Sequence, residues 1–101
     1  MAEASGPISN AIKTKLTEAL QPTSMRLVNQ SSAHSGHFGH DGSAASDSGE
    51  THFKLEVVST RFDKMPMIKR HQLIYSLLDE EIKAGVHALT MSTKTPTEAA
   101  R

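Results

Sequence analysis

The chain has 101 residues, with 11 basic and 11 acidic side chains, a formal net charge of zero, 37% hydrophobic residues and no cysteine. This size and composition fit one small globular domain over residues 1–101. A neutral chain has no overall cationic field that would attract nucleic acid or an anionic membrane. Without cysteine, metal chemistry would have to run through the six histidines.

The first half of the chain predicts one helix and two strands. Apolar residues recur at three- and four-residue spacing over residues 7–20, with a proline at the start and another just after the end, which predicts an amphipathic helix. Residues 24–29 alternate as a short strand. Residues 52–57 alternate more clearly and form the second strand, with one apolar face made of Phe53, Leu55 and Val57. The two strands should pair as an antiparallel hairpin.

Two stretches have no periodic pattern. Residues 30–50 are rich in Ser, Gly and His, and Phe38 is their only large apolar residue, so they cannot bury enough surface to offset the entropy of ordering the backbone. We therefore expect a long loop between the two strands. Residues 1–6 are expected to form a flexible N-terminus, and no apolar run in the chain approaches the roughly 20 residues that a membrane-spanning helix needs.

The second half predicts a turn at residues 62–65, a helix from Pro66 to Gly85, a strand over residues 86–93 and a short terminal turn or helix from Thr95. Because a helix separates the second and third strands, these two strands should be parallel. The predicted fold is α+β, in the order helix, strand, strand, helix, strand. It has a three-stranded mixed sheet with both helices on one face, and the charged residues of the second helix form a solvated surface.

The loop carries a possible metal site. His34, His37 and His40 are three residues apart and could converge on one zinc ion, with a fourth ligand from Asp41, Asp47 or Glu50. A solvated loop with adventitious metal affinity is the simpler interpretation, because structural zinc sites generally use cysteine and fixed secondary structure.

Other chemistry has little support in the sequence. No serine stands in a strained strand-to-helix elbow, and no glycine-rich turn leads from a strand into a helix, so we expect no catalytic residue and no nucleotide cofactor. The run from Gly36 to Gly39 (GHFG) has the form of a KH-domain clamp for nucleic acid. It lies, however, in a predicted hairpin loop without basic residues, whereas phosphate binding needs positive charge.

Several ordered segments closely resemble the BolA family. They are Glu50–Ser59 (ETHFKLEVVS), Arg61–Phe62, Lys69–His71 (KRH), Gly85–Leu89 (GVHAL) and Lys94–Pro96 (KTP), within a similarity that spans roughly residues 6–98. This resemblance implies a compact fold similar to class II KH domains. It also implies a eukaryotic BolA-like protein that forms a heterodimer with a monothiol glutaredoxin and shares a [2Fe–2S] cluster with the glutaredoxin and its glutathione.

The resemblance also implies individual roles. His87 matches the histidine that the family carries at the start of the last strand, and the run Asn29–His34 nominates His34 as the second cluster ligand, with His37 as its rival. This places the chain in the histidine-loop branch of the family. Histidine can replace cysteine on one iron of a [2Fe–2S] centre, so a cysteine-free chain can fill this role. The residues implied to contact the partner are Lys69, Arg70, His71 and Ala88.

We therefore expect a non-enzymatic iron–sulfur cluster assembly or transfer factor that serves iron–sulfur apoproteins and is monomeric without its partner. A KH-like nucleic-acid-binding transcriptional regulator is the alternative, and autonomous zinc binding by the loop histidines is a third hypothesis. A mitochondrial location is expected, with a cytoplasmic one as the alternative. Two positions depart from the family pattern: Lys64 stands where members commonly carry glycine, and Gln72 replaces an arginine.

Overall fold

The computed structural model describes residue 4, residues 6–30 and residues 50–100. Its elements are helix α1 (Pro7–Leu20), strands β1 (Ser24–Asn29) and β2 (His52–Val58), the 3₁₀ helix η2 (Thr60–Phe62), helices α3 (Met67–Leu77) and α4 (Asp79–Lys83), strand β3 (Ala88–Lys94) and helix α5 (Pro96–Ala99). The part of the chain described has no helix of the length and apolar character needed to cross a membrane.

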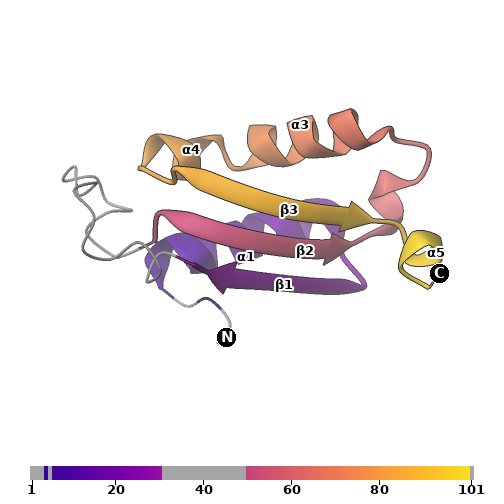
Figure 1. Cartoon of the computed structure of the whole chain (residues 1–101), viewed down its shortest axis with the longest axis horizontal. Helices are drawn as coiled ribbons and strands as arrows, with labels where there is room; N and C mark the ends of the chain where they lie inside the picture. Colours follow the sequence, from indigo (N-terminus) through magenta and orange to yellow (C-terminus); the bar gives the residue numbers. More distant parts are fainter. Residues whose placement is uncertain (1–3, 5, 31–49, 101) are drawn as a thin grey trace.

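The three strands form one mixed sheet in the order β1-β2-β3. Strands β1 and β2 are antiparallel, with Leu27 opposite Leu55, whereas β2 and β3 are parallel, with Phe53 opposite Leu89. Both predicted pairings are confirmed. Figure 1 shows α3 and α4 running alongside β3, and α1 crossing behind the sheet.

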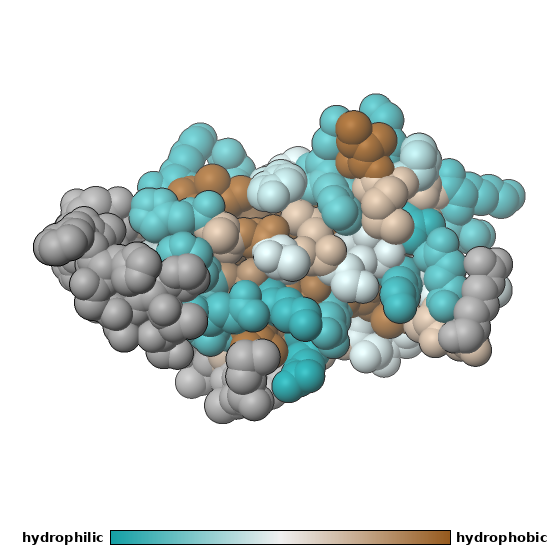
Figure 2. All heavy atoms as spheres, in the orientation of Figure 1, coloured by the Kyte–Doolittle hydropathy of each residue, from teal (hydrophilic) through white to brown (hydrophobic). Residues whose placement is uncertain are grey.

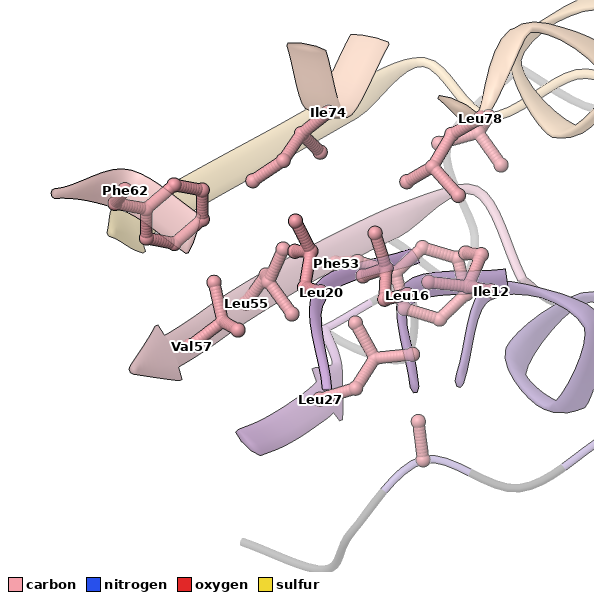
Figure 3. Packing of buried hydrophobic residues seen from close by; sticks show 12 residues of the cluster. Ile12, Leu16, Leu20, Leu27, Phe53, Leu55, Val57, Phe62, Ile74 and Leu78 are labelled. Carbon is pink, nitrogen blue, oxygen red and sulfur yellow. The ribbon is translucent and has the colours of Figure 1, made fainter. Parts of the chain in front are cut away.

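The hydrophobic core lies on one face of this sheet. Figure 3 shows the side chains of Phe53, Leu55 and Val57 on β2 pointing towards residues of α1 and α3. These three residues are at most 1% exposed, as are their partners Ile12, Leu16 and Leu20 on α1, Ile74 on α3, and Leu78. The apolar face of β2, which repeats every two residues, therefore packs against the apolar face of α1, which repeats with helical spacing. The prediction of helices on one face of the sheet is confirmed.

The prediction of one helix from Pro66 to Gly85 is wrong, because the helix is interrupted at Leu78 (φ −103°, ψ 19°). Three acidic residues occupy the first turn of α4, where the positive end of a helix dipole favours them, so the local sequence supports a new helix start. The break orients α4 so that buried Glu81 accepts a hydrogen bond from Lys15 Nζ of α1 at 2.9 Å. This ion pair raises the pKa of Lys15.

Two predicted boundaries also change. The turn expected at residues 62–65 begins earlier, as η2, and Phe62 is fully buried in the core. The third strand spans residues 88–94 rather than 86–93, because the parallel ladder starts where Ala88 lies opposite His52. Val86 instead packs against the core just before the strand, at 8% exposure.

The start of α1 is held by groups distant in sequence. Ala4, in the stretch expected to be flexible, is buried, and its amide donates to the carbonyl of Leu27 at 2.7 Å. Gly6 precedes α1 with a φ of +135°, and a Cβ at this position would lie 2.9 Å from the carboxyl group of Glu50. Glycine is thus required here for both conformation and space.

Candidate metal centre at one end of the sheet

His87 is exposed immediately before β3, on a backbone that is firmly attached to its neighbours. Gly85, with a φ of +118°, follows α4, and Val86 anchors the next residue in the core. The amides of His87 and Ala88 both donate to the carbonyl of Thr51, at 2.8 and 3.2 Å. The imidazole of His87 is therefore presented at the surface from a position fixed by β2.

His52 lies beside His87, although its sequence pattern alone suggests no role. The ring centroids are 6.1 Å apart and the ring planes are inclined by 53°. His52 Nδ1 is 2.7 Å from the hydroxyl oxygen of Thr51. In the tautomer in which Nδ1–H donates to this hydroxyl, Nε2 carries the lone pair of the ring and is the atom through which an imidazole binds a metal. The histidine pair could have been predicted from the parallel pairing of the second and third strands, because this pairing brings the starts of β2 and β3 together.

The spacing of the two rings is close to that of two imidazoles on one metal ion. With metal–nitrogen bonds of about 2.0–2.1 Å, two ring centroids around a tetrahedral ion lie roughly 5–6 Å apart. Among residues 4, 6–30 and 50–100, no group of three or more histidine, cysteine or acidic side chains is placed to hold a metal. A complete coordination shell therefore needs donors from elsewhere.

The histidine-rich segment is attached at this same end of the sheet (Figure 1, left). The amide of Gln30, its preceding neighbour, donates to the carbonyl of His52 at 2.7 Å, and Glu50, which follows it, leads directly into Thr51. His34, His37, His40, Asp41 and Asp47 lie outside the described residues. His34 is four residues beyond Gln30, which sets a covalent reach of about 14 Å.

Glu50, considered above as a zinc ligand, has a structural role instead. Its carboxylate is 1% exposed and lies at the N-terminus of α1. Oε2 accepts from the amide of Ser9 at 2.6 Å and from its hydroxyl at 2.8 Å, and Oε1 accepts from the amide of Ile8 at 3.3 Å. Glu50, one of the three candidates for a fourth zinc ligand, is thus a helix cap that acts over a long distance in sequence, because an anion at a helix N-terminus is stabilised by the free amides and the dipole.

The expectation of a solvated surface on the second helix is wrong for Arg70, which is 6% exposed. Its Nε donates to the carbonyl of Met65 at 2.9 Å, and Nη1 donates to the carbonyl of Thr93 at 3.0 Å and to Glu98 Oε1 at 2.7 Å. The guanidinium also lies 5.7 Å from the ring centroid of Phe62. Arg70 therefore joins α3, β3 and α5, and its hydrogen bond lowers the pKa of Glu98 to about 2.

The remaining residues nominated for partner contact do not form one patch. Lys69 is exposed in the first half of α3, whereas Ala88 is exposed at the beginning of β3, next to His87. Because α3 and β3 run in opposite directions, these two residues lie towards opposite ends of the strand (Figure 1). His71 is partly buried on α3. Only Ala88 therefore adjoins the candidate metal centre.

Comparison with known proteins agrees with this arrangement of elements. A model of the BolA-like protein family matches residues 16–98. The chain belongs to the BolA-like family. It is 40% identical over 95 residues to BolA-like protein 1 of Mus musculus, which covers 94% of this chain and 63% of the relative. It is 46% identical over 87 residues to "SufE-like protein 1, chloroplastic/mitochondrial" of Arabidopsis thaliana, which covers 86% of this chain and only 23% of that protein.

Solved BolA structures have the same fold. The BolA domain of SufE1 from Arabidopsis thaliana matches with a TM-score of 0.79 at 39% identity, over 94% of this chain and 99% of the domain. The resemblance to the BolA family and the predicted α+β fold are therefore both confirmed. The chain therefore spans about a quarter of the length of the SufE-like relative and just under two thirds of the length of the mouse relative.

Proposed function

We propose that this BolA-like chain is a non-enzymatic adaptor that supplies histidine ligands to a [2Fe–2S] cluster shared with a monothiol glutaredoxin and its bound glutathione. One observation carries the proposal. His87 is exposed on a rigidly held backbone beside His52, at the end of the sheet where the histidine-bearing segment is attached. This arrangement provides an incomplete set of imidazole donors that a partner could complete.

In this proposal His87 is the fixed ligand and His34 is the second, with His37 and His52 as its rivals. Two imidazoles on one iron, with thiolates from the glutaredoxin cysteine and from glutathione on the other, would give a coordination shell of the Rieske type. A chain without cysteine is well suited to supply only the histidine half. The chain would be monomeric alone and heterodimeric with its partner, and it would pass the cluster to iron–sulfur apoproteins.

The name of one relative supports the compartment. A BolA domain forms part of a SufE-like protein, and the name of that protein includes chloroplastic and mitochondrial locations. We therefore favour an organelle, and specifically the mitochondrion, over the cytoplasm.

The structure supports the alternative function, nucleic-acid binding, less well than it supports cluster binding. Of the basic side chains Lys64, Lys69 and Arg70 around the start of α3, Arg70 is used in internal hydrogen bonds, which leaves Lys64 and Lys69 exposed. Two lysines supply little of the positive charge that phosphate binding requires. The GHFG run of residues 36–39 lies outside the described residues.

The test is a titration of a monothiol glutaredoxin, loaded with [2Fe–2S] and glutathione, with this chain, followed by visible circular dichroism and absorption. Wild type should change the spectrum and saturate at one equivalent. The same titration is then run with the single alanine variants at His87, His34, His37 and His52, and with His40→Ala as a matched control to which the family resemblance assigns no ligand role.

Loss of the spectral change in His87→Ala and in one other variant would identify both ligands. A wild-type spectrum from His87→Ala would exclude His87 from the site. Far-ultraviolet circular dichroism distinguishes ligand loss from unfolding, and because the His87 side chain is exposed, its removal should leave the fold intact.

A further inference from the structure

An open groove of about 490 Å³ lies between the start of α3 and the end of β3, at the opposite end of the strand from His87 (Figure 1). Figure 2 shows a hydrophobic patch over α3, and Met67 and Ile68 at the start of this helix are 51% and 64% exposed. The groove is lined by the thioether side chains of Met67 and Met91 and by the imidazole of His71.

The imidazole in this groove has an unused nitrogen. His71 Nε2 is buried and has no hydrogen-bond partner among the described residues. A buried polar atom without a partner costs about 1–3 kcal/mol, so such atoms are uncommon and often have a role. The neighbouring sulfur atoms are weak hydrogen-bond acceptors, but they are good ligands for soft metal ions.

The packing of α3 on β3 brings these side chains together. The hydroxyl of Thr93 donates to Met67 Sδ at 3.1 Å, which fixes one point of contact and orients the thioether. From there, α3 and β3 run in opposite directions (Figure 1). Four helical residues advance about 6 Å and two strand residues advance about 6.6 Å, so His71 comes level with Met91. Met91 and Thr93 share a face of β3, which directs both towards the helix.

We propose that Met67, His71 and Met91 form a binding site for Cu(I). Thioether sulfur selects this soft ion, and imidazole nitrogen also binds copper well. A hydrogen bond from Thr93 occupies one lone pair of Met67 Sδ and leaves the second to the metal. In a chain without cysteine, the methionines are the only soft sulfur donors. This site is separate from the histidine pair at the other end of β3 and does not depend on the proposed cluster function.

Methionine methyl NMR tests the site directly. The chain labelled with ¹³C at the methionine methyl groups carries five methionines, and it is titrated with Ag(I), a soft ion of the same charge that does not change oxidation state. The signals of Met67 and Met91 should shift and saturate together, while those of Met25 and Met65 serve as internal references. Cu(I) affinity is then measured without oxygen, by competition with a coloured Cu(I) chelator.

The variants Met67→Leu, Met91→Leu and His71→Asn should each weaken Cu(I) binding by about tenfold or more, the scale on which even indirect partners of a metal ligand matter. Met25→Leu, which alters a partly buried core methionine, is the matched control and should bind as wild type does. Unmoved Met67 and Met91 signals, or unchanged affinity in the His71→Asn variant, would overturn the proposal. Binding by histidines of residues 31–49 alone would give that result.

Discussion

Replacing Glu50 with alanine should destabilise the start of α1. Two short hydrogen bonds from Ser9, at 2.6 and 2.8 Å, end on one carboxylate oxygen that is shielded from water. Hydrogen bonds to a charged group contribute about 1.5–3 kcal/mol each, so the variant should lose roughly 3 kcal/mol of unfolding free energy. For a domain of this size, that loss lowers the melting temperature by about 12–24 °C.

The measurement is urea and thermal unfolding followed by far-ultraviolet circular dichroism. Glu50→Gln keeps the shape of the side chain and one acceptor oxygen but loses the charge, so its stability should lie between those of the alanine variant and wild type. Glu18→Ala, at an exposed position of α1, is the matched control and should change stability by less than about 0.5 kcal/mol. A Glu50→Ala variant as stable as this control would refute the role assigned to the cap.

Three further predictions concern the other end of the molecule. Lys64→Gly should stabilise the chain by about 0.5 kcal/mol in urea unfolding, because Lys64 has a φ of +63° and glycine adopts this conformation without strain; a loss of stability would contradict this reasoning. Arg70→Met should lower the free energy of unfolding by about 2–4 kcal/mol in the same assay, since it leaves the carbonyls of Met65 and Thr93 without this donor. A loss below about 1 kcal/mol would argue against the role of Arg70 in joining α3, β3 and α5. Since the pKa of Glu98 is about 2 in the folded chain against 4.5 ordinarily, its contribution to stability is complete above pH 4.5 and is lost as the pH falls towards 2. Urea midpoints measured between pH 5 and pH 2.5 should therefore fall less steeply in Glu98→Gln than in wild type, and equal slopes would exclude this contribution.

The departure of Lys64 from the family pattern has a physical explanation in the structure. The resemblance identifies this position as one where BolA members commonly carry glycine, and the backbone here is left-handed, which favours glycine over any residue with a Cβ. The resemblance to the family marked the position as unusual. Only the backbone conformation gives the reason, because φ depends on the turn between η2 and α3 and not on the side chain found there.

The sequence by itself determined the α+β order and the two strand pairings. The helical stripe of α1 and the alternation of β2 are local periodicities, and each is strong enough to state which face is buried. The parallel pairing of β2 with β3 followed from the intervening helix. The break at Leu78 was missed because apolar residues keep the same helical spacing on both sides of it.

Only the tertiary structure decided which polar side chains are internal. Arg70 stands in a basic run that resembles a solvated surface, and its burial became visible only when Thr93 and Glu98 were seen beside it. Glu50 caps a helix 41 residues away, and His52 meets His87 only across two paired strands. Local patterns record which residues prefer to be buried. Contacts between groups far apart in the chain depend on how the helices and strands pack, and no periodic pattern in the sequence predicts them.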